Sequence, residues 1–97
     1  MAAEYRLTAE AEDDLQGIAD YTFETFGPAQ AEAYGLGLRN CFASLIDNPL
    51  LGRDYGFLRP GLRRYEHESH SVYYQLTDTG ILILRVLHQR MDPARHL

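Results

Sequence analysis

The chain has 97 residues, of which 45% are hydrophobic and 24% charged, and its formal net charge is −5. This length suits one domain, residues 1–97, and this balance argues against disorder. The negative charge argues against broad binding along a nucleic-acid backbone, which needs a positive field. No apolar run approaches the roughly 18 residues of a membrane span, and the N-terminus does not resemble a secretory signal. We therefore expect a cytoplasmic protein.

The charge is distributed unevenly along the chain. Residues 1–48 carry nine carboxylates and two arginines, whereas residues 49–97 carry seven arginines and five carboxylates. All basic residues are arginine, so a lysine base is unavailable, while bidentate recognition of carboxylates is possible. Because Cys41 is the only cysteine, an internal disulfide and a cysteine-based metal site are excluded. We expect Cys41 to be a small buried residue on a helix. The pattern favours a protein target, or an acidic partner segment lying on the arginines, with no metal or cofactor.

The first half of the chain predicts a short strand followed by two helices. Residues 5–7 are expected to form an edge strand, and Thr8 suits the N-cap of a helix whose opening turns are acidic. Gly27 and Pro28 end this helix and start a second one, which stops at Asn48. Apolar residues recur at helical spacing in both. We expect an antiparallel hairpin whose carboxylates form a solvated outer face.

The second half predicts three strands after a loop. Residues 50–58 contain two glycines and show neither helical nor strand pattern. Strands are expected at 62–66, 71–76 and 81–88, with a hairpin turn at 77–80. The predicted order is β-α-α-β-β-β, an α+β fold in which the helical hairpin packs on an antiparallel sheet.

The last predicted strand carries an arginine inside an apolar run. Strict alternation places Arg85 on the side of Ile83 and Leu87, opposite to Leu84, Val86 and His88. A charge in a core strand is unfavourable unless it is paired or solvated, so Arg85 either pairs with a carboxylate such as Glu66 or Glu68, or belongs to a site. On the preceding strand Tyr73 and Tyr74 alternate, which predicts one in the core and one at a surface.

Polar residues gather where these strands would meet. Strand pairing would bring together four arginines and two histidines: Arg59, Arg63, Arg64, Arg85, His70 and His88. A histidine can act as a general acid or base, although hydrogen-bonded structural histidines are commoner. We take this end of the sheet as a candidate surface for a target or partner. The full candidate set is Arg59, Arg63, Arg64, His70, Tyr74, Arg85, His88, Arg90 and Met91.

Three segments carry a family resemblance along the chain. They are RPGLRR at residues 59–64, SHSVYY at 69–74 and RVLHQRMD at 85–92, preceded by NP at 48–49 and LGR at 51–53. With these pieces in order and at matching spacing, the whole chain resembles the ParE branch of the ParE/RelE toxin superfamily, the toxin half of type II toxin–antitoxin modules.

The resemblance implies two different activities on one fold. ParE-like members inhibit DNA gyrase and are neutralised by an antitoxin whose disordered C-terminal segment folds on the toxin. They contact operator DNA only indirectly, through the antitoxin. RelE-like members are ribosome-dependent mRNA endoribonucleases, for which Arg64, Arg85 and His88 would be the catalytic residues. The absence of lysine, the absence of a tyrosine after His88 and the net charge favour a gyrase inhibitor that is not itself an enzyme. A non-toxic regulator that only binds the antitoxin is the third alternative.

Overall fold

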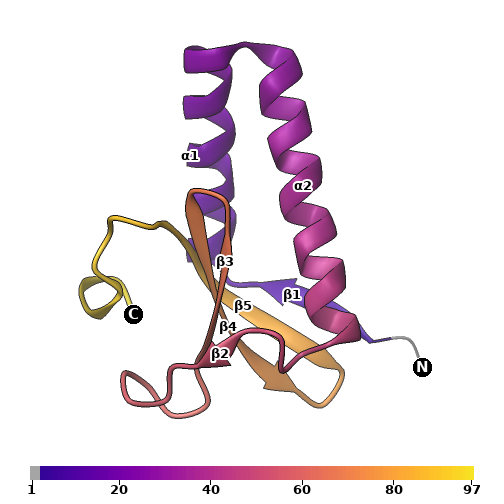
Figure 1. Ribbon diagram of the computed structural model, residues 1–97, viewed down its shortest axis with the longest axis vertical. Helices are drawn as coiled ribbons and strands as arrows, with labels where there is room; N and C mark the ends of the chain where they lie inside the picture. Colours follow the sequence, from indigo (N-terminus) through magenta and orange to yellow (C-terminus); the bar gives the residue numbers. More distant parts are fainter. Residues whose placement is uncertain (1–2) are drawn as a thin grey trace.

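The computed structural model describes residues 3–97 as a helical hairpin above a five-stranded sheet (Figure 1). Its elements are β1 (Glu4–Leu7), α1 (Ala9–Phe26), α2 (Pro28–Asp47), β2 (Arg53–Asp54), β3 (Arg63–His67), β4 (His70–Thr77), β5 (Gly80–His88) and the 3-10 helix η1 (Pro93–Arg95). The predicted α+β class and the order of its main elements are confirmed. Within residues 3–97, neither helix combines the length and apolar character that crossing a bilayer requires.

The sheet is mixed, whereas the sequence predicted an antiparallel one. Its strand order is β1-β5-β4-β3-β2, and β1 runs parallel to β5 while the other neighbours are antiparallel. The start of β1 lies against the start of β5, so that a Cβ at Gly80 would overlap the carbonyl oxygen of Glu4. β2 was also missed, because Arg53 and Asp54 form a strand only by pairing with β3 and are too short to show a pattern.

The helix boundaries follow the predicted capping signals. The Thr8 hydroxyl accepts a hydrogen bond from the Ala11 amide at 3.0 Å and donates to the Leu84 carbonyl at 2.7 Å, so it both caps α1 and ties it to β5. Gly27 separates the helices with φ at 92°, a conformation that favours glycine, and Pro28 occupies the first position of α2. α2 ends at Asp47 with Asn48 as its C-cap.

The helices cover one face of the sheet, and we call it the helix face. Its buried residues come from α1, α2, β4 and β5: Ala11, Leu38, Cys41, Phe42, Leu45, Val72, Tyr74, Ile81, Ile83 and Val86. Cys41 is buried as predicted. Burial of this apolar surface is the main force that holds the hairpin on the sheet.

The opposite face, the far face, is also buried, although no helix covers it. Leu62, Tyr73, Leu84 and Leu87 form a second cluster, against which Tyr55, Leu58, Leu82 and Leu97 pack. The segment 55–58 and the C-terminal tail thus close this face. Tyr73 lies here and Tyr74 on the helix face, and both are buried, so the prediction that one of them lines a surface was wrong.

A β-bulge in β5 changes the predicted alternation. Tyr73 lies opposite Arg85 and Tyr74 opposite Ile83, which leaves Leu84 without a partner in β4. After this extra residue Val86 joins the helix face and Leu87 the far face, whereas strict alternation had grouped Leu87 with Ile83. The bulge also places Arg85 at the transition between the two faces.

Candidate functional site

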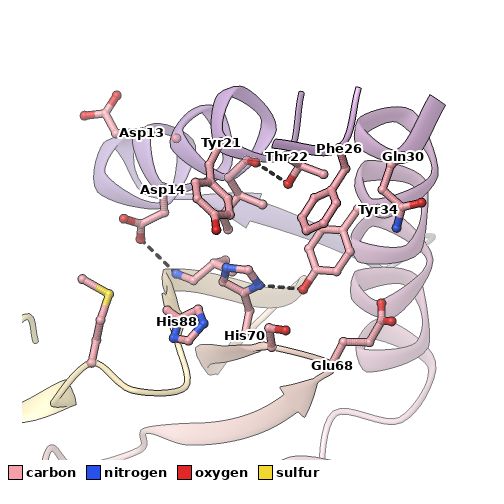
Figure 2. Close-up of a pocket in the computed structure, with 15 residues that line it drawn as sticks. Asp13, Asp14, Tyr21, Thr22, Phe26, Gln30, Tyr34, Glu68, His70 and His88 are labelled. Atoms are coloured by element: carbon pink, nitrogen blue, oxygen red, sulfur yellow. Dashed lines mark hydrogen bonds between the residues drawn. The ribbon is translucent and has the colours of Figure 1, made fainter. Parts of the chain in front are cut away.

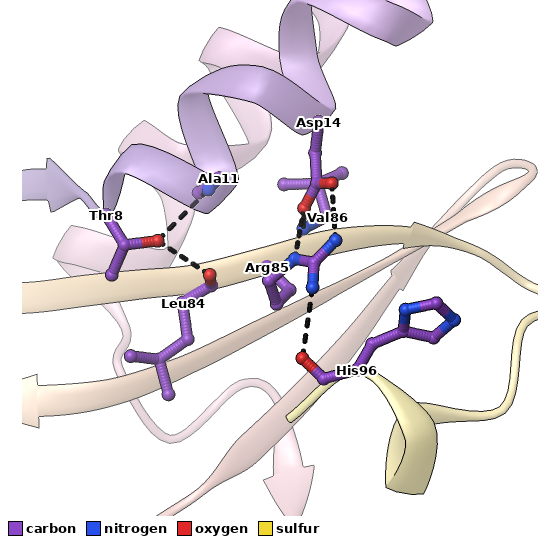
Figure 3. Close-up of polar contacts among 7 residues, drawn as sticks. All are labelled: Thr8, Ala11, Asp14, Leu84, Arg85, Val86 and His96. Atoms are coloured by element: carbon purple, nitrogen blue, oxygen red, sulfur yellow. Dashed lines mark hydrogen bonds and ion pairs between the residues drawn. The ribbon is translucent and has the colours of Figure 1, made fainter.

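Arg85 is anchored to helix α1 by a carboxylate that the sequence did not predict as its partner. Its Nε and Nη2 donate to the two oxygens of Asp14, each at 2.8 Å, and its Nη1 donates to the His96 carbonyl at 3.0 Å (Figure 3). Asp14 also accepts from the Val86 amide at 2.9 Å. Both charged side chains are mostly buried, with 19% and 13% of their surface exposed. The predicted ion pair of Arg85 with a carboxylate is therefore confirmed, but the partner is Asp14 and not Glu66 or Glu68, because α1 packs on β5 at the bulge.

This contact links three distant segments of the chain. The bidentate hydrogen bonds that the Arg85 guanidinium donates to Asp14 raise its pKa, although burial acts in the opposite direction. The other eight carboxylates of residues 1–48 are exposed, as the predicted solvated face requires. Asp14 is the exception, and its role is to fasten α1 and the tail to β5.

Arg64 is held on the far face by aromatic rings. Its guanidinium carbon lies 5.4 Å from the ring centre of Tyr55 and 5.8 Å from that of Tyr73. It donates to the Tyr55 hydroxyl at 3.0 Å and to the Ser71 hydroxyl at 3.2 Å, and lies 3.2 Å from a Glu66 oxygen. Cation–π contact and burial fix this side chain in the structure.

Arg63 and Tyr74 organise the segment that follows α2. Arg63 donates through Nε to the Gly52 carbonyl at 2.8 Å. The Tyr74 hydroxyl accepts from the Gly52 amide at 2.8 Å and donates to the Pro49 carbonyl at 2.7 Å. A Cβ at Gly52 would lie 2.5 Å from that hydroxyl, so this position requires glycine. Both predicted site residues therefore have structural partners.

The histidines meet at the end of the sheet nearest the hairpin. His70 and His88 are opposite each other on β4 and β5, with ring centres 5.6 Å apart. The Tyr34 hydroxyl of α2 lies 2.6 Å from Nδ1 of His70. Burial lowers the pKa of His70, and neighbouring His88 and His67 lower it further, while Asp14 acts in the opposite sense. His70 is thus a neutral, hydrogen-bonded histidine near pH 7.

A groove opens between the hairpin and this end of the sheet, and we call it the hairpin groove (Figure 2). It has a volume of about 670 Å³ and is bordered by α1, α2, the β3–β4 turn, the end of β5 and Met91. Its apolar surface is supplied by Ile18, Tyr21, Phe26, Tyr34, Val86 and Met91. Tyr21 and Phe26 are 65% and 64% exposed, and Met91 is 41% exposed. Exposed apolar surface gathered around a concavity is typical of a protein-binding site.

The predicted site residues therefore divide into three groups, and the first consists of residues with hydrogen-bond partners within the chain: Arg63, Arg64, Tyr74 and Arg85. Strand pairing places Arg64, Tyr73 and Arg85 side by side across β3, β4 and β5, but the two guanidinium groups bind different partners. The predicted convergence of all six residues on one end of the sheet was wrong, because Arg63 lies at the start of β3 whereas His70 and His88 pair at its other end. His70, His88 and Met91 line the hairpin groove. Arg59 and Arg90 are exposed. The sequence reasoning missed the groove residues of α1 and α2, because Tyr21, Phe26 and Tyr34 fit an ordinary helical apolar stripe.

The three residues named for RNA cleavage each have a hydrogen-bond partner within the chain. Arg85 is bound to Asp14, Arg64 is bound between Tyr55 and Tyr73, and Nδ1 of His88 accepts from the Arg90 amide at 3.2 Å. No group of three or more His, Cys, Asp or Glu side chains able to hold a metal ion is found in residues 3–97.

The chain matches known toxins over its full length. Residues 5–93 match the family described as "ParE toxin of type II toxin-antitoxin system, parDE". Toxin ParE1 of Mycobacterium tuberculosis (strain H37Rv) is 38% identical over 98 residues, which cover 100% of both chains. A solved structure titled "Chromosomal ParDE TA system from P. aeruginosa" superposes with a TM-score of 0.75 at 24% identity, covering 89% of this chain and 95% of that one.

A second solved structure shows that the fold extends beyond ParE proteins. The toxin–antitoxin complex RelBE2 of Mycobacterium tuberculosis superposes with a TM-score of 0.66 at 22% identity, covering 92% of this chain and 100% of that one. At this identity the likeness concerns the fold alone, so the assignment depends on the sequence matches. On those matches, the chain belongs to the ParE toxin family of type II toxin–antitoxin systems.

Proposed function

We propose that this toxin inhibits DNA gyrase and is neutralised by direct binding of its cognate antitoxin, in the cytoplasm. The observation that carries the proposal is the match to ParE toxins over the full chain. The separate structural partners of Arg64 and Arg85 favour an inhibitor over a ribonuclease, because RNA cleavage needs cationic and acid–base groups free to reach one phosphodiester. Operator DNA is contacted only through the antitoxin.

Supercoiling of relaxed plasmid by purified gyrase tests the proposal directly. We expect added toxin to reduce supercoiling and to trap cleaved DNA, and prior addition of the antitoxin to prevent both effects. Unchanged supercoiling in the presence of a folded toxin that still binds its antitoxin would reject gyrase as the target. Cleavage of mRNA on translating ribosomes would then indicate the ribonuclease, and normal growth after induced expression without antitoxin would indicate the regulator.

The arginine-bearing surface of the second half of the chain is the one we propose for gyrase. The sequence suggested Arg59, Arg63, Arg64, Arg85 and Arg90 together with Met91. Substituting Arg63 or Arg64 would disturb the fold, because these side chains bind backbone carbonyls and aromatic rings.

The exposed arginines give a cleaner test of that surface. We expect the Arg59→Glu/Arg90→Glu variant to lose gyrase inhibition while keeping the wild-type unfolding midpoint. Arg39→Glu, on the exposed side of α2, is the control and is expected to remain active. Full activity of the double variant would show that this surface does not contact gyrase.

The hairpin groove is the surface that we propose for the antitoxin. A segment that folds on binding needs apolar surface to offset its loss of conformational entropy. The groove provides that surface through Tyr21, Phe26 and Met91. His70 and His88 at its floor are then antitoxin-contacting residues.

A further inference from the structure

The charge of the hairpin groove is opposite to that of the second half of the chain. The charged residues that line it are Asp13, Asp14 and Glu68, and none of its lining residues within 3–97 is an arginine. Asp14 is compensated by Arg85. Asp13 is exposed and forms no ion pair within residues 3–97. Glu68, in the β3–β4 turn, is largely exposed, and one of its oxygens lies 3.3 Å from Nε2 of His67. Two carboxylates thus remain available to a ligand, one from α1 and one from the turn.

These two carboxylates flank an apolar surface. Figure 2 shows Asp13 on the α1 side and Glu68 below Tyr34 on the opposite side, with the Tyr21 and Phe26 rings between them. On the floor of the groove, burial together with its histidine neighbours lowers the pKa of His70, which disfavours a positive charge there. The local field therefore selects against an acidic ligand.

We infer that the hairpin groove binds a cationic amphipathic segment of the antitoxin, in which apolar side chains contact Tyr21, Phe26 and Met91 and arginine or lysine side chains pair with Asp13 and Glu68. The inference rests on the proposed antitoxin pairing and concerns the chemistry of the segment that binds here. It differs from the sequence-based expectation of acidic residues lying on arginines, because Arg63, Arg64 and Arg85 already have partners within the chain.

The chain's own basic tail does not supply this segment. Leu97 packs into the far-face cluster, and the His96 carbonyl accepts from Arg85. The tail is therefore held on the other side of β5, which leaves the groove open for a partner.

Two designed helical peptides provide the first test. They share one Leu/Phe pattern, and their polar faces carry arginine in one peptide and glutamate in the other. We expect the arginine peptide to bind the toxin more tightly, by about tenfold or more, and to weaken as salt is raised. Equal binding, or tighter binding of the glutamate peptide, would overturn the inference.

Matched variants separate the groove from the general negative charge of the protein. Asp13→Asn and Glu68→Gln are each expected to weaken the arginine peptide by about two- to fivefold, as exposed ion pairs do. Phe26→Ala is expected to weaken both peptides by about tenfold. The controls are Glu24→Gln and Phe23→Ala, which alter exposed α1 residues outside the groove and should change little. Equal losses in the controls would show that only overall charge and hydrophobicity matter.

The full-length antitoxin distinguishes failure of this inference from failure of the proposed function. Binding to wild-type toxin and loss of affinity in Asp13→Asn/Glu68→Gln would support both. Equal binding to the wild type and to this double variant would reject the cationic segment while leaving antitoxin pairing intact. Absence of binding to the wild type would reject the pairing itself.

Discussion

The two faces of the sheet are buried by different means. On the helix face, two long helices supply a regular apolar stripe, and the cluster there is large and continuous. On the far face, a short segment and the tail cover four buried residues, and the arginine Arg64 takes part in the covering by stacking on Tyr55 and Tyr73. Regular elements bury a face mainly through the periodic spacing of their apolar residues, whereas the irregular segment here also depends on specific contacts of Arg64 with Tyr55.

The two sides of the molecule also differ in whether their charged and aromatic side chains stabilise the fold or remain exposed to a partner. The far face uses its arginine as a structural group, whereas the helix-face side of the molecule leaves aromatic rings and carboxylates exposed around the hairpin groove. Most of the arginines predicted as site residues thus have partners within the chain, namely Arg63, Arg64 and Arg85. The surface that remains available for a partner comes mainly from the helices.

Truncation of one leucine on each face measures this difference directly. Leu45 of α2 is fully buried, so Leu45→Ala is expected to lower the free energy of unfolding by about 2–5 kcal/mol. Leu97 is only partly buried against the far face, so Leu97→Ala should lower it by roughly 1 kcal/mol. Urea denaturation of both variants provides the measurement. Equal losses would show that the tail closes the far face as firmly as the helices close the other.

Removal of Asp14 disrupts the point where the two faces are connected. Asp14→Ala leaves the Arg85 guanidinium and the Val86 amide without their acceptor, and should lower the free energy of unfolding by about 2–3 kcal/mol. The neighbouring exposed residue is the control, and Asp13→Ala should change stability by less than about 0.5 kcal/mol. A stable Asp14→Ala variant would show that α1 and the tail do not depend on this contact.

The Tyr74 hydroxyl holds the segment that follows α2 through two backbone hydrogen bonds. Tyr74→Phe removes its two hydrogen bonds, with the Gly52 amide and the Pro49 carbonyl, and should lower the free energy of unfolding by about 1–2 kcal/mol. Tyr65→Phe is the control on the adjacent strand, since the Tyr65 hydroxyl forms no hydrogen bond within residues 3–97. Similar stability of both variants would contradict a role for Tyr74 in fixing this segment.

Acidification should weaken the groove side of the molecule through His70. Its pKa is lower in the folded state than in the unfolded chain, so its contribution to stability is present above about pH 6.5 and is lost as the pH falls through the folded value. Urea denaturation at pH 7.5 and 5.5 should reveal the loss, and His70→Gln should reduce the difference. An unchanged pH dependence in this variant would assign the effect to other groups.

The smallest effect concerns the reactivity of Cys41 in the helix-face core. Burial raises the pKa of its thiol to about 11, so little thiolate exists at pH 8. We expect alkylation by iodoacetamide to be much slower in the native protein than in urea. Rapid alkylation of the native protein would show that α2 opens readily from the sheet.

The sequence determined the main elements because their signals are local. Thr8, Gly27 with Pro28, and Asn48 mark helix ends through capping and backbone preferences that need no tertiary partner. Short runs rich in apolar and aromatic residues on either side of the turn at 77–80 marked β4 and β5 for the same reason. The family resemblance was also carried by the sequence alone, and the full-length matches confirm it.

Only the tertiary structure decided where Arg85 binds, how β1 joins the sheet and which side chains remain free. Arg85 and Asp14 are separated by 71 positions, so no local pattern connects them. The bulge at Leu84 shifts the side-chain alternation by one residue, which strict periodicity does not predict. The hairpin groove likewise exists only because α1, α2 and the ends of β4 and β5 meet, since a concave surface depends on packing between elements that are distant in sequence.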